Sequence, residues 1–399
     1  PVTGRWSILG WDPWLTLTAR GPAITLKEDG AVRRWGANPW EALRQVLHRY
    51  QSRSLTTPVS GVVGLLGYLS YDLNRWIERL PPPRRASPPL PDMVWFGMRM
   101  AVVVDHSREQ SWIVSLADPH QPLKRARDDA MARIEAWEAS PRPVSQVPSE
   151  CHKPPLVLEA TTSQAEFEQM VHRTLAWIRQ GEIFQANVAQ RFVARWDGSN
   201  LALYLALRQI NPSPFACFLS WGESAVLGCS PERLIRVEEG WAETRPIAGT
   251  RPRGHTPQED VLRGFELLMS EKERAEHIML VDLARNDLGR VCRFGSIAAD
   301  ELMTLEEYSH VIHIVSQISG QLRPGADAVD VIRAVFPGGT ITGCPKVRCM
   351  ELIQALEPVA RGLYTGSMGR VGFDGSMDLN IAIRTMVVHG RCLTYHVGA

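Results

Sequence analysis

The sequence lacks the features that would assign it at once to a membrane, secreted or nucleic-acid-binding class. No apolar run approaches the roughly 20 residues needed to span a bilayer, and no secretory leader is visible at its start. Neither sign of charge is in excess, because 44 Lys and Arg face 43 Asp and Glu, for a formal net charge of +1. We therefore expect no nucleic-acid partner, no membrane partner and no charged disordered arm.

Cysteine is sparse and without pattern. The seven cysteines are scattered, odd in number and contain no CxxC pair. Such usage is typical of buried or incidental thiols in a reducing compartment, so we expect a cytoplasmic protein. The sequence also has no HExxH helix, no serine nucleophile elbow and no GxGxxG after a strand, which disfavours zinc, hydrolase and dinucleotide-binding functions.

What is present is a globular composition, 44% hydrophobic and 22% charged, over 399 residues. Short apolar runs alternate with helical segments without a regular βαβ period, which predicts an α+β fold with largely antiparallel sheets. The predicted strands include 62–69, 102–104, 112–114, 215–219 and 225–229, and the predicted helices include 124–137, 259–286 and 327–335.

A segment rich in Pro and Ser, from Ser140 to Pro155, is predicted to be a linker. It separates residues 1–140 from residues 156–399. Ser163 and Glu166 then form a capping box for a helix. The predicted apolar face of that helix consists of Phe167, Val171, Leu175 and Ile178.

Two carboxylates in the predicted helix 259–286 form a candidate metal site. Glu273 and Glu276 are three residues apart, so both fall on one helical face. Mg²⁺ commonly takes one or two carboxylates together with substrate oxygens and waters. The alternative is a solvated face, since further charged residues surround the pair. The apolar segment 279–284 that follows indicates that the helix then enters the core.

Two other titratable groups have both a structural and a catalytic interpretation. His313 lies in the apolar run 311–315, which suits either a packed histidine or an acid–base group whose pKa is set by burial. Glu232 stands at a strand end. It is either a turn carboxylate paired with Arg233 or a general acid whose pKa is raised in a dry pocket.

Anion-binding candidates lie further along the chain. Residues 336–346 place Thr340, Thr342 and Lys346 at a loop-to-helix transition, where free N–H groups can bind anions; a plain helix entry is the alternative. Arg384, in a predicted apolar strand, would pair with a substrate carboxylate, and Tyr364 could add a hydroxyl. The alternative for both is a solvent-facing edge position.

A run of motifs in the second half carries a family resemblance. In order they are Ser230-Pro231-Glu232-Arg233, Arg245-Pro246-Ile247-Ala248-Gly249-Thr250, Glu273-Arg274-Ala275-Glu276-His277, His313-Ile314-Val315-Ser316, Gly338-Gly339-Thr340-Ile341-Thr342-Gly343-Cys344-Pro345-Lys346 and Ile383-Arg384-Thr385. In this order and spacing they resemble the chorismate-utilising enzymes, over nearly the whole chain. The resemblance implies a large two-sheet β-sandwich with helices outside, and a cleft that binds chorismate and Mg²⁺.

The resemblance also implies individual roles. Glu232 would be the acid that helps the C4 hydroxyl leave, His313 would lie near the ring, and Glu273 and Glu276 would hold Mg²⁺. Ala248 stands where folate-branch members typically carry a nucleophilic lysine. Tyr364 and Arg384 would anchor the enolpyruvyl carboxylate, and Gly366 and Gly398 would be backbone donors. The implied substrate contacts are Gly249, Thr250, Thr340, Tyr364, Gly366, Arg384 and Gly398.

Family members that add water carry a lysine at the position of Gln185, so the resemblance favours amination. Two aminating members remain: aminodeoxychorismate synthase component I of the folate branch, and anthranilate synthase component I of the tryptophan branch. Thr342 and Ser367 resemble the folate-branch form and Ala248 the tryptophan-branch form, and we favour the folate branch.

The implied nitrogen donor is a separate glutamine amidotransferase subunit that supplies ammonia, since the chain has no convincing Cys/His amidotransferase signature.

Residues 1–140 would be the N-terminal part of the sandwich and a possible docking and regulatory region, and residues 156–399 the catalytic part of one intertwined domain. A final helix with further Mg²⁺-binding glutamates is expected beyond Ala399 and is absent from the sequence given. Two other interpretations stay open: a non-catalytic binding relative, and a generic α+β scaffold.

Overall fold

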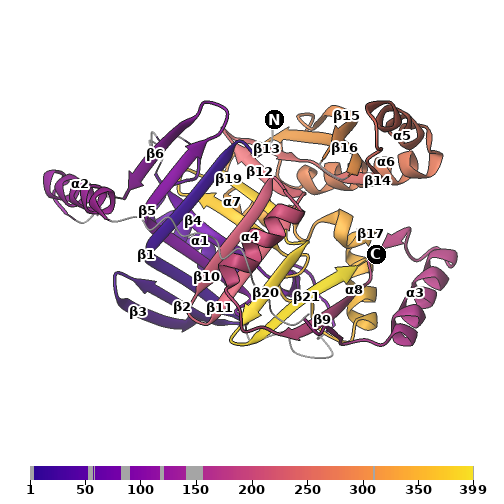
Figure 1. The fold of residues 1–399 in the computed structure, drawn as a ribbon, viewed down its shortest axis with the longest axis horizontal. Helices are drawn as coiled ribbons and strands as arrows, with labels where there is room; N and C mark the ends of the chain where they lie inside the picture. Colours follow the sequence, from indigo (N-terminus) through magenta and orange to yellow (C-terminus); the bar gives the residue numbers. More distant parts are fainter. Residues whose placement is uncertain are drawn as a thin grey trace.

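The computed structural model describes residues 4–52, 57, 59–81, 90–116, 121–140, 156–308 and 311–398. Two antiparallel sheets form the body of the molecule, and helices lie outside them (Figure 1). The predicted α+β class and the two-sheet architecture are therefore confirmed. The predicted linker from Ser140 to Pro155 falls, after Ser140, outside the described residues.

The larger sheet has 13 strands and draws on both halves of the chain. Strand β4 from the N-terminal part pairs with β18 from the C-terminal part, with Tyr68 opposite Met368. Its strands are β1 (Trp6–Arg20), β2 (Ala23–Glu28), β3 (Ala31–Gly36), β4 (Gly64–Leu69), β5 (Met93–Asp105), β6 (Gln110–Ser115), β12 (Arg233–Glu238), β13 (Trp241–Thr244), β14 (Ile247–Pro252), β15 (Ala298–Glu307), β16 (Val311–Gln321), β18 (Ser367–Gly372) and β19 (Met377–Ile381).

The smaller sheet has six strands in the order β10-β11-β20-β21-β9-β7, and a separate two-stranded ladder joins β8 to β17. The strands predicted at 102–104 and 112–114 pair as the hairpin β5–β6, and those predicted at 215–219 and 225–229 pair as the hairpin β10–β11. The bounds are β7 (Glu159–Ala160), β8 (Gln185–Ala186), β9 (Ala189–Arg195), β10 (Phe215–Trp221), β11 (Ser224–Ser230), β17 (Gly343–Cys344), β20 (Thr385–His389) and β21 (Cys392–Gly398).

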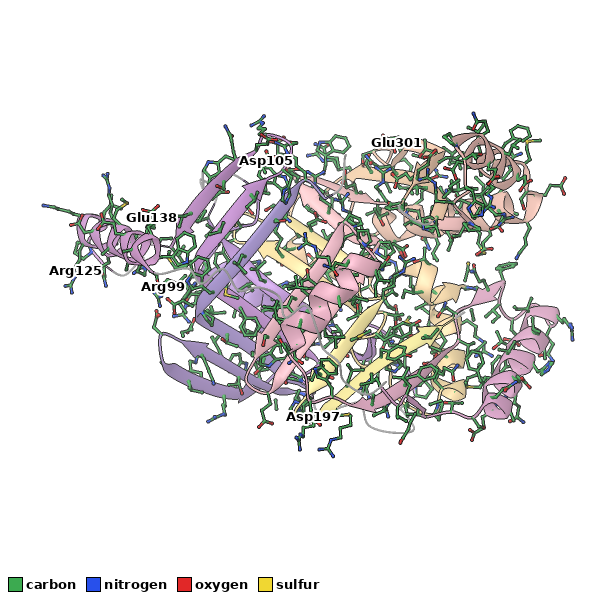
Figure 2. All side chains as sticks on the ribbon, in the orientation of Figure 1. Arg99, Asp105, Arg125, Glu138, Asp197 and Glu301 are labelled. Atoms are coloured by element: carbon green, nitrogen blue, oxygen red, sulfur yellow. The ribbon has the colours of Figure 1, made fainter. Side chains whose placement is uncertain are left out.

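Helices cover the outer faces of both sheets. The α-helices are α1 (Pro39–Arg49), α2 (Leu123–Ala139), α3 (Gln164–Arg179), α4 (Asn200–Ile210), α5 (Pro257–Met269), α6 (Glu271–Gly289), α7 (Ala328–Val335) and α8 (Lys346–Leu356), and the 3₁₀ helices are η1 (Tyr71–Trp76) and η2 (Gly339–Ile341). Helices α1 and α7 bury apolar side chains against the large sheet, and α4 packs on the small one. Helix α2 lies at the opposite end of the molecule from β15, as the labelled Arg125 and Glu301 indicate (Figure 2).

The two sheets share a buried core. Tyr68 and Met368 of the large sheet pack with Val226 of the small sheet, and each is at most 1% exposed. Fully burying such a side chain stabilises the fold by about 2 kcal/mol relative to exposure. This core fixes how the sheets face each other. Within the described residues, no helix is long and apolar enough to cross a membrane.

The helix predicted over 259–286 is two helices. Helix α5 ends and α6 begins at Ser270, whose extended backbone (φ −69°, ψ 110°) breaks the helical path. The Ser270 side chain accepts a hydrogen bond from the Glu273 N–H and so caps α6. The break places Glu273 in the first turn of a new helix.

Helix α3 has the predicted capping box but a different buried face. Ser163 and Glu166 exchange the two expected hydrogen bonds. Of the predicted apolar stripe, Val171 is 36% and Leu175 is 41% exposed. Phe167 and Ile178 of the predicted stripe do pack against the core, and Met170 is buried against Val188 and Leu356. The buried face therefore overlaps the predicted one in part and is rotated toward Met170.

Candidate active site

Two neighbouring strands of the small sheet continue into the large sheet at the same place. Residues 231–232 join β11 to β12, and residues 382–384 join β19 to β20. The two links are bonded to each other: Ser230 Oγ donates to the Ile381 carbonyl over 2.5 Å, and the Ile381 N–H donates to the Glu232 carbonyl over 3.0 Å. We call these two hydrogen-bonded links the crossover, and the candidate site lies around it.

Glu232 lies on the first link and is only 6% exposed. Burial raises the pKa of its carboxyl to about 7, while the nearby Thr340 hydroxyl and Ile247 N–H act in the opposite direction. The Arg233 guanidinium pairs instead with two carboxylates of the large sheet, at 2.8 and 3.0 Å. The interpretation of Glu232 as a turn carboxylate paired with Arg233 is therefore wrong. The group can give up a proton near neutral pH.

Arg384 lies on the second link, not in an apolar strand as predicted. Its backbone is left-handed (φ +49°), because the chain changes sheets here, and its side chain is exposed. The Arg384 guanidinium donates to the neutral Asn211 amide oxygen at 3.0 Å and forms no ion pair with the described residues. Its positive charge is therefore available to an incoming anion.

His313 lies on β16 beside the crossover and is 5% exposed. Its Nδ1 is 2.9 Å from the Thr250 hydroxyl, and its Nε2 is buried without a hydrogen-bond partner among the described residues. Burial lowers the pKa of the imidazole, a backbone contact with Gly249 opposes this, and the Arg384 charge lowers it further. The ring is therefore neutral at pH 7, with Nε2 free for a substrate group.

Gly249 forms a bulge in β14 next to α6. The register of β14 on β16 shifts between Ala248 and Thr250, and Gly249 has φ +79°. A Cβ on Gly249 would lie 3.1 Å from Leu267 Cδ1 and 3.2 Å from Glu273 Oε2. Only glycine combines this backbone with so close an approach. Bulges of this kind redirect side chains beside active sites, as here for Thr250.

Glu273 and Glu276 lie on one face of α6, as their spacing predicts. Glu273 Oε1 is 3.3 Å from Arg251 Nη1, and Glu276 Oε1 accepts a hydrogen bond from Gln185 Nε2 at 2.9 Å. No group of three or more His, Cys, Asp or Glu in the described ranges is arranged to hold a metal. Two carboxylates on a helix face nevertheless fit Mg²⁺, which completes its shell with water and substrate oxygens.

Tyr364, Asn187 and Gly398 converge on the small-sheet side. A Cβ on Gly398 would lie 2.5 Å from Tyr364 Oη and closer still to Asn187 Oδ1. The Tyr364 ring is stacked on His396, with centroids 5.1 Å apart. Burial raises the pKa of Tyr364, so its hydroxyl keeps its proton, and Asn187 Oδ1 is buried without a partner among the described residues. Two polar side chains and the backbone of Gly398 therefore meet at one place.

Three other candidates are already used by the protein. The Gly366 N–H donates to the Leu363 carbonyl at 2.8 Å, which differs from its expected role as a donor to substrate. The Thr342 hydroxyl donates within its own turn at 2.9 Å. Lys346 Nζ pairs with Asp287 Oδ2 at 2.5 Å, and both side chains are about 90% buried, so Lys346 is not a free anion-binding cation.

Sequence reasoning did not assign His277, which is fully buried. Its Nε2 is 2.5 Å from Ser316 Oγ, which ties α6 to β16. Burial lowers the pKa of His277 to about 4, so the ring is neutral at pH 7. Its spacing of three and four residues from Leu280 and Val281, both buried, was the available signal for a core position.

Residues 4–399 match the family described as chorismate binding enzyme. An anthranilate synthase component I-like protein of Synechocystis sp. is 44% identical over 340 residues, covering 84% of this chain and 67% of that protein. Aminodeoxychorismate synthase component 1 of Bacillus subtilis is 38% identical over 389 residues, covering 97% and 82%.

Solved structures agree with these relatives. Anthranilate synthase component I from Streptococcus pneumoniae superposes with a TM-score of 0.88 at 32% identity, covering 99% of this chain and 87% of that one. The menaquinone-specific isochorismate synthase from Escherichia coli, at 17% identity and a TM-score of 0.67, shares the fold. Together with the match over nearly the whole sequence, these similarities show that the chain belongs to the chorismate binding enzymes.

Proposed function

We propose that the protein is an aminodeoxychorismate synthase component I. In this role it replaces the C4 hydroxyl of chorismate by an amino group in a Mg²⁺-dependent reaction, with ammonia from a glutaminase subunit. The observation that carries the proposal of amination is the hydrogen bond from Gln185 to Glu276. An amide has no basic lone pair with which to deprotonate water, whereas ammonia is a nucleophile without such help. The lysine that water-adding members carry at this position could activate water, whereas the Gln185 amide can only position Glu276.

Glu232 is the proposed general acid. Loss of the C4 hydroxyl requires a proton, and a buried carboxyl with a pKa of about 7 is partly protonated at neutral pH. The Thr340 hydroxyl lies near this carboxyl, and both residues line the same cavity. General acid catalysis of this kind typically contributes about 10²- to 10⁴-fold to the rate.

Substrate anchoring is divided between the two sides of the site. On the small-sheet side the Tyr364 hydroxyl, the backbone at Gly398 and the Arg384 guanidinium would receive the enolpyruvyl carboxylate. On the large-sheet side Glu273 and Glu276 would hold Mg²⁺, which when bound supplies positive charge for the ring carboxylate. The Nε2 atom of the neutral His313 would face the chorismate ring, between the enolpyruvyl carboxylate and the ring carboxylate.

The proposed reaction balances without a further reactant. The ammonia lone pair forms a C–N bond at the ring, the C4–O bond breaks with a shift of the ring double bonds, and Glu232 gives its proton to the departing hydroxyl. The ammonium adduct then returns a proton to the Glu232 carboxylate, so chorismate and ammonia give an amine and water. Because Ala248 offers no nucleophile, ammonia itself would attack first at C2. A second ammonia would then attack C4, the ring double bonds would shift back and the C2–N bond would break, with Glu232 protonating the departing amine so that the first ammonia is released. Thr342 and Ser367 support this folate-branch assignment by resemblance.

Anthranilate synthase component I is the second candidate, and Ala248 is the observation that favours it. The Ala248 methyl group is 6% exposed and lies directly before the Gly249 bulge, so no side chain there can form a covalent bond with C2. Ammonia added at C2 would then stay there, and elimination of pyruvate would give anthranilate.

Product identity tests the proposal. The protein would be incubated with chorismate, Mg²⁺ and ammonium, and the products separated by chromatography with mass detection. Aminodeoxychorismate with its enolpyruvyl group intact, and no anthranilate, is the expected result. Anthranilate with pyruvate would move the assignment to the second candidate. Isochorismate would contradict both, and binding of chorismate without turnover would identify a non-catalytic relative.

A further inference from the structure

Arg361 is a fully buried cation that none of the proposed steps uses. It is 2% exposed and lies between α8 and β18. Its guanidinium forms an ion pair with Glu357, with Nη2 2.6 Å from Oε1 and Nε 2.9 Å from Oε2. Replacing a buried ion pair by well-packed apolar side chains is often neutral or stabilising. Stability alone is therefore a weak reason for this arrangement.

The remaining N–H groups of Arg361 reach three separate segments. Nη1 donates to the Ile341 carbonyl at 3.0 Å and to the Thr365 hydroxyl at 3.2 Å, and Nη2 donates to the Asn187 carbonyl at 2.6 Å. The planar fork of an arginine can serve several acceptors in fixed directions, which lysine cannot do.

Each of these segments carries a group that faces the proposed chorismate position. Ile341 follows Thr340, which lines the same cavity as Glu232. Thr365 follows Tyr364, and the Arg361 guanidinium also lies 5.5 Å from the Tyr364 ring centroid. The Asn187 side chain ends beside Gly398, and its Oδ1 has no hydrogen-bond partner in the described ranges.

We propose that Arg361 is a positioning residue that holds these three segments in register at the enolpyruvyl end of the site. The proposal rests on the chorismate chemistry proposed above and adds a residue that does not itself touch the substrate. Among the described residues Arg361 forms no hydrogen bond or ion pair with Glu273, Glu276 or Gln185, and Gln185 is held by the pairing of β8 with β17. We therefore expect the effect of Arg361 to fall on chorismate rather than on Mg²⁺ or ammonia.

The test is Arg361→Lys, assayed by chorismate consumption so that it is valid whichever product forms. Lysine keeps the charge beside Glu357 but cannot bond all three segments at once. Small misplacements of positioned groups cost up to about 100-fold, so we expect the KM for chorismate to rise about 10-fold or more. The KM for ammonium and the half-saturating Mg²⁺ concentration should stay within about twofold, because the groups expected at that end are held independently of Arg361.

Arg44→Lys is the matched control. Arg44 also forms a multi-bond contact, to Asp327 at 2.6 Å and Asp330 at 2.5 Å, but at the junction of α1 and α7. We expect a lower Tm for this variant and an unchanged KM for chorismate.

A folded Arg361→Lys protein whose chorismate KM equals that of the wild type would overturn the proposal, as would an equal rise for chorismate, ammonium and Mg²⁺. If the variant does not fold, the double variant Arg361→Met with Glu357→Met carries the same expectations. If the wild type consumes no chorismate, the proposed function fails by itself. Equilibrium dialysis with chorismate then still tests Arg361. We expect Arg361→Lys to bind chorismate about 10-fold more weakly than the wild type, and equal binding would refute the positioning role.

Discussion

Gln185 Nε2 donates a hydrogen bond to Glu276 Oε1 over 2.9 Å, which joins the short strand β8 to helix α6. Glu276 is thus held by a neutral amide and forms no ion pair with the described residues. Glu273, in contrast, shares its carboxylate with the Arg251 guanidinium. Of the two proposed Mg²⁺ ligands, Glu273 is therefore the one for which Arg251 would compete with the metal.

Replacing this carboxylate tests the metal role. We expect Glu276→Gln to lower the Mg²⁺-dependent rate on the order of 100-fold, the scale for removing one preorganised electrostatic group. The measurement is chorismate consumption across a Mg²⁺ titration. Asp282→Asn is the control, because Asp282 is exposed on the same helix and pairs with Arg285. Unchanged Mg²⁺ dependence in Glu276→Gln would remove the residue from the metal site.

The pH dependence of the rate tests Glu232. Its acid must be protonated to act, and its pKa is about 7, so the rate should fall as the pH rises through neutrality. Glu232→Gln should lose about 10²- to 10⁴-fold in rate and lack this descending limb. Initial rates are compared at constant free ammonia, which separates the titration of Glu232 from that of ammonium. A wild-type rate that is flat across neutral pH would argue against the acid role.

Buried Glu232 should also affect stability. Its folded-state pKa of about 7 lies above the ordinary value of 4.5, so the native state binds the proton more tightly than the unfolded state does. Stability should therefore fall as the pH rises from 4.5 to about 7, by on the order of 3 kcal/mol. Chemical denaturation of wild type and Glu232→Gln across this range should show the slope only in the wild type.

The bulge at Gly249 can be tested against a glycine of similar conformation. Gly249→Ala should lose about 1 kcal/mol or more from its positive φ, and should also displace Glu273, which raises the Mg²⁺ concentration needed for half-maximal rate. Gly222, with φ +51° in the β10–β11 hairpin, has no neighbour within 4 Å of an added Cβ. Gly222→Ala should show the stability loss alone. An equal Mg²⁺ requirement in the two variants would contradict the proposed coupling.

The buried contact between His277 and Ser316 predicts a stability loss. Ser316 Oγ bonds His277 Nε2 and also accepts from the Met303 N–H at 2.9 Å. Ser316→Ala leaves these groups unsatisfied and should cost about 1–3 kcal/mol. Ser319→Ala, on the same strand with an exposed hydroxyl bond, should change stability by no more than about 0.5 kcal/mol. Denaturant unfolding measures both.

His277 should further make the protein sensitive to acid. Its pKa of about 4 in the folded state lies below the ordinary 6.5, so the unfolded state takes up a proton first. Stability should therefore fall as the pH drops from 6.5 to about 4. His277→Gln should have a flatter unfolding profile in this range, measured by denaturant titration; a slope as steep as in the wild type would assign the effect to other groups.

Local patterns were sufficient to predict much of the fold. The β5–β6 and β10–β11 hairpins, the α3 capping box and α7 follow from periodicity and turn residues within a short stretch of chain. The break at Ser270 was missed, although its serine is a good N-cap, because both flanking segments have high helical propensity. Such a break depends on how each helix packs.

Long-range relationships were the part that sequence could not supply. Arg384 has the flanking residues of an apolar strand, and only the change of sheet places it on an exposed link. Lys346 forms an ion pair with Asp287, and Arg361 donates a hydrogen bond to the Asn187 carbonyl, although each pair is far apart in the sequence. Residue type could suggest that these groups bind anions, but the choice between a protein partner and a ligand is decided by the tertiary fold.

The bonded crossover has a consequence for the geometry of the site. Because Ser230 is hydrogen-bonded to Ile381, the links that carry Glu232 and Arg384 are tied directly to each other. His313 belongs only to the large sheet and Gly398 only to the small one. The separation of the acid and the arginine is therefore set by bonds within the crossover, whereas the separation of His313 and Gly398 is set by how the two sheets pack.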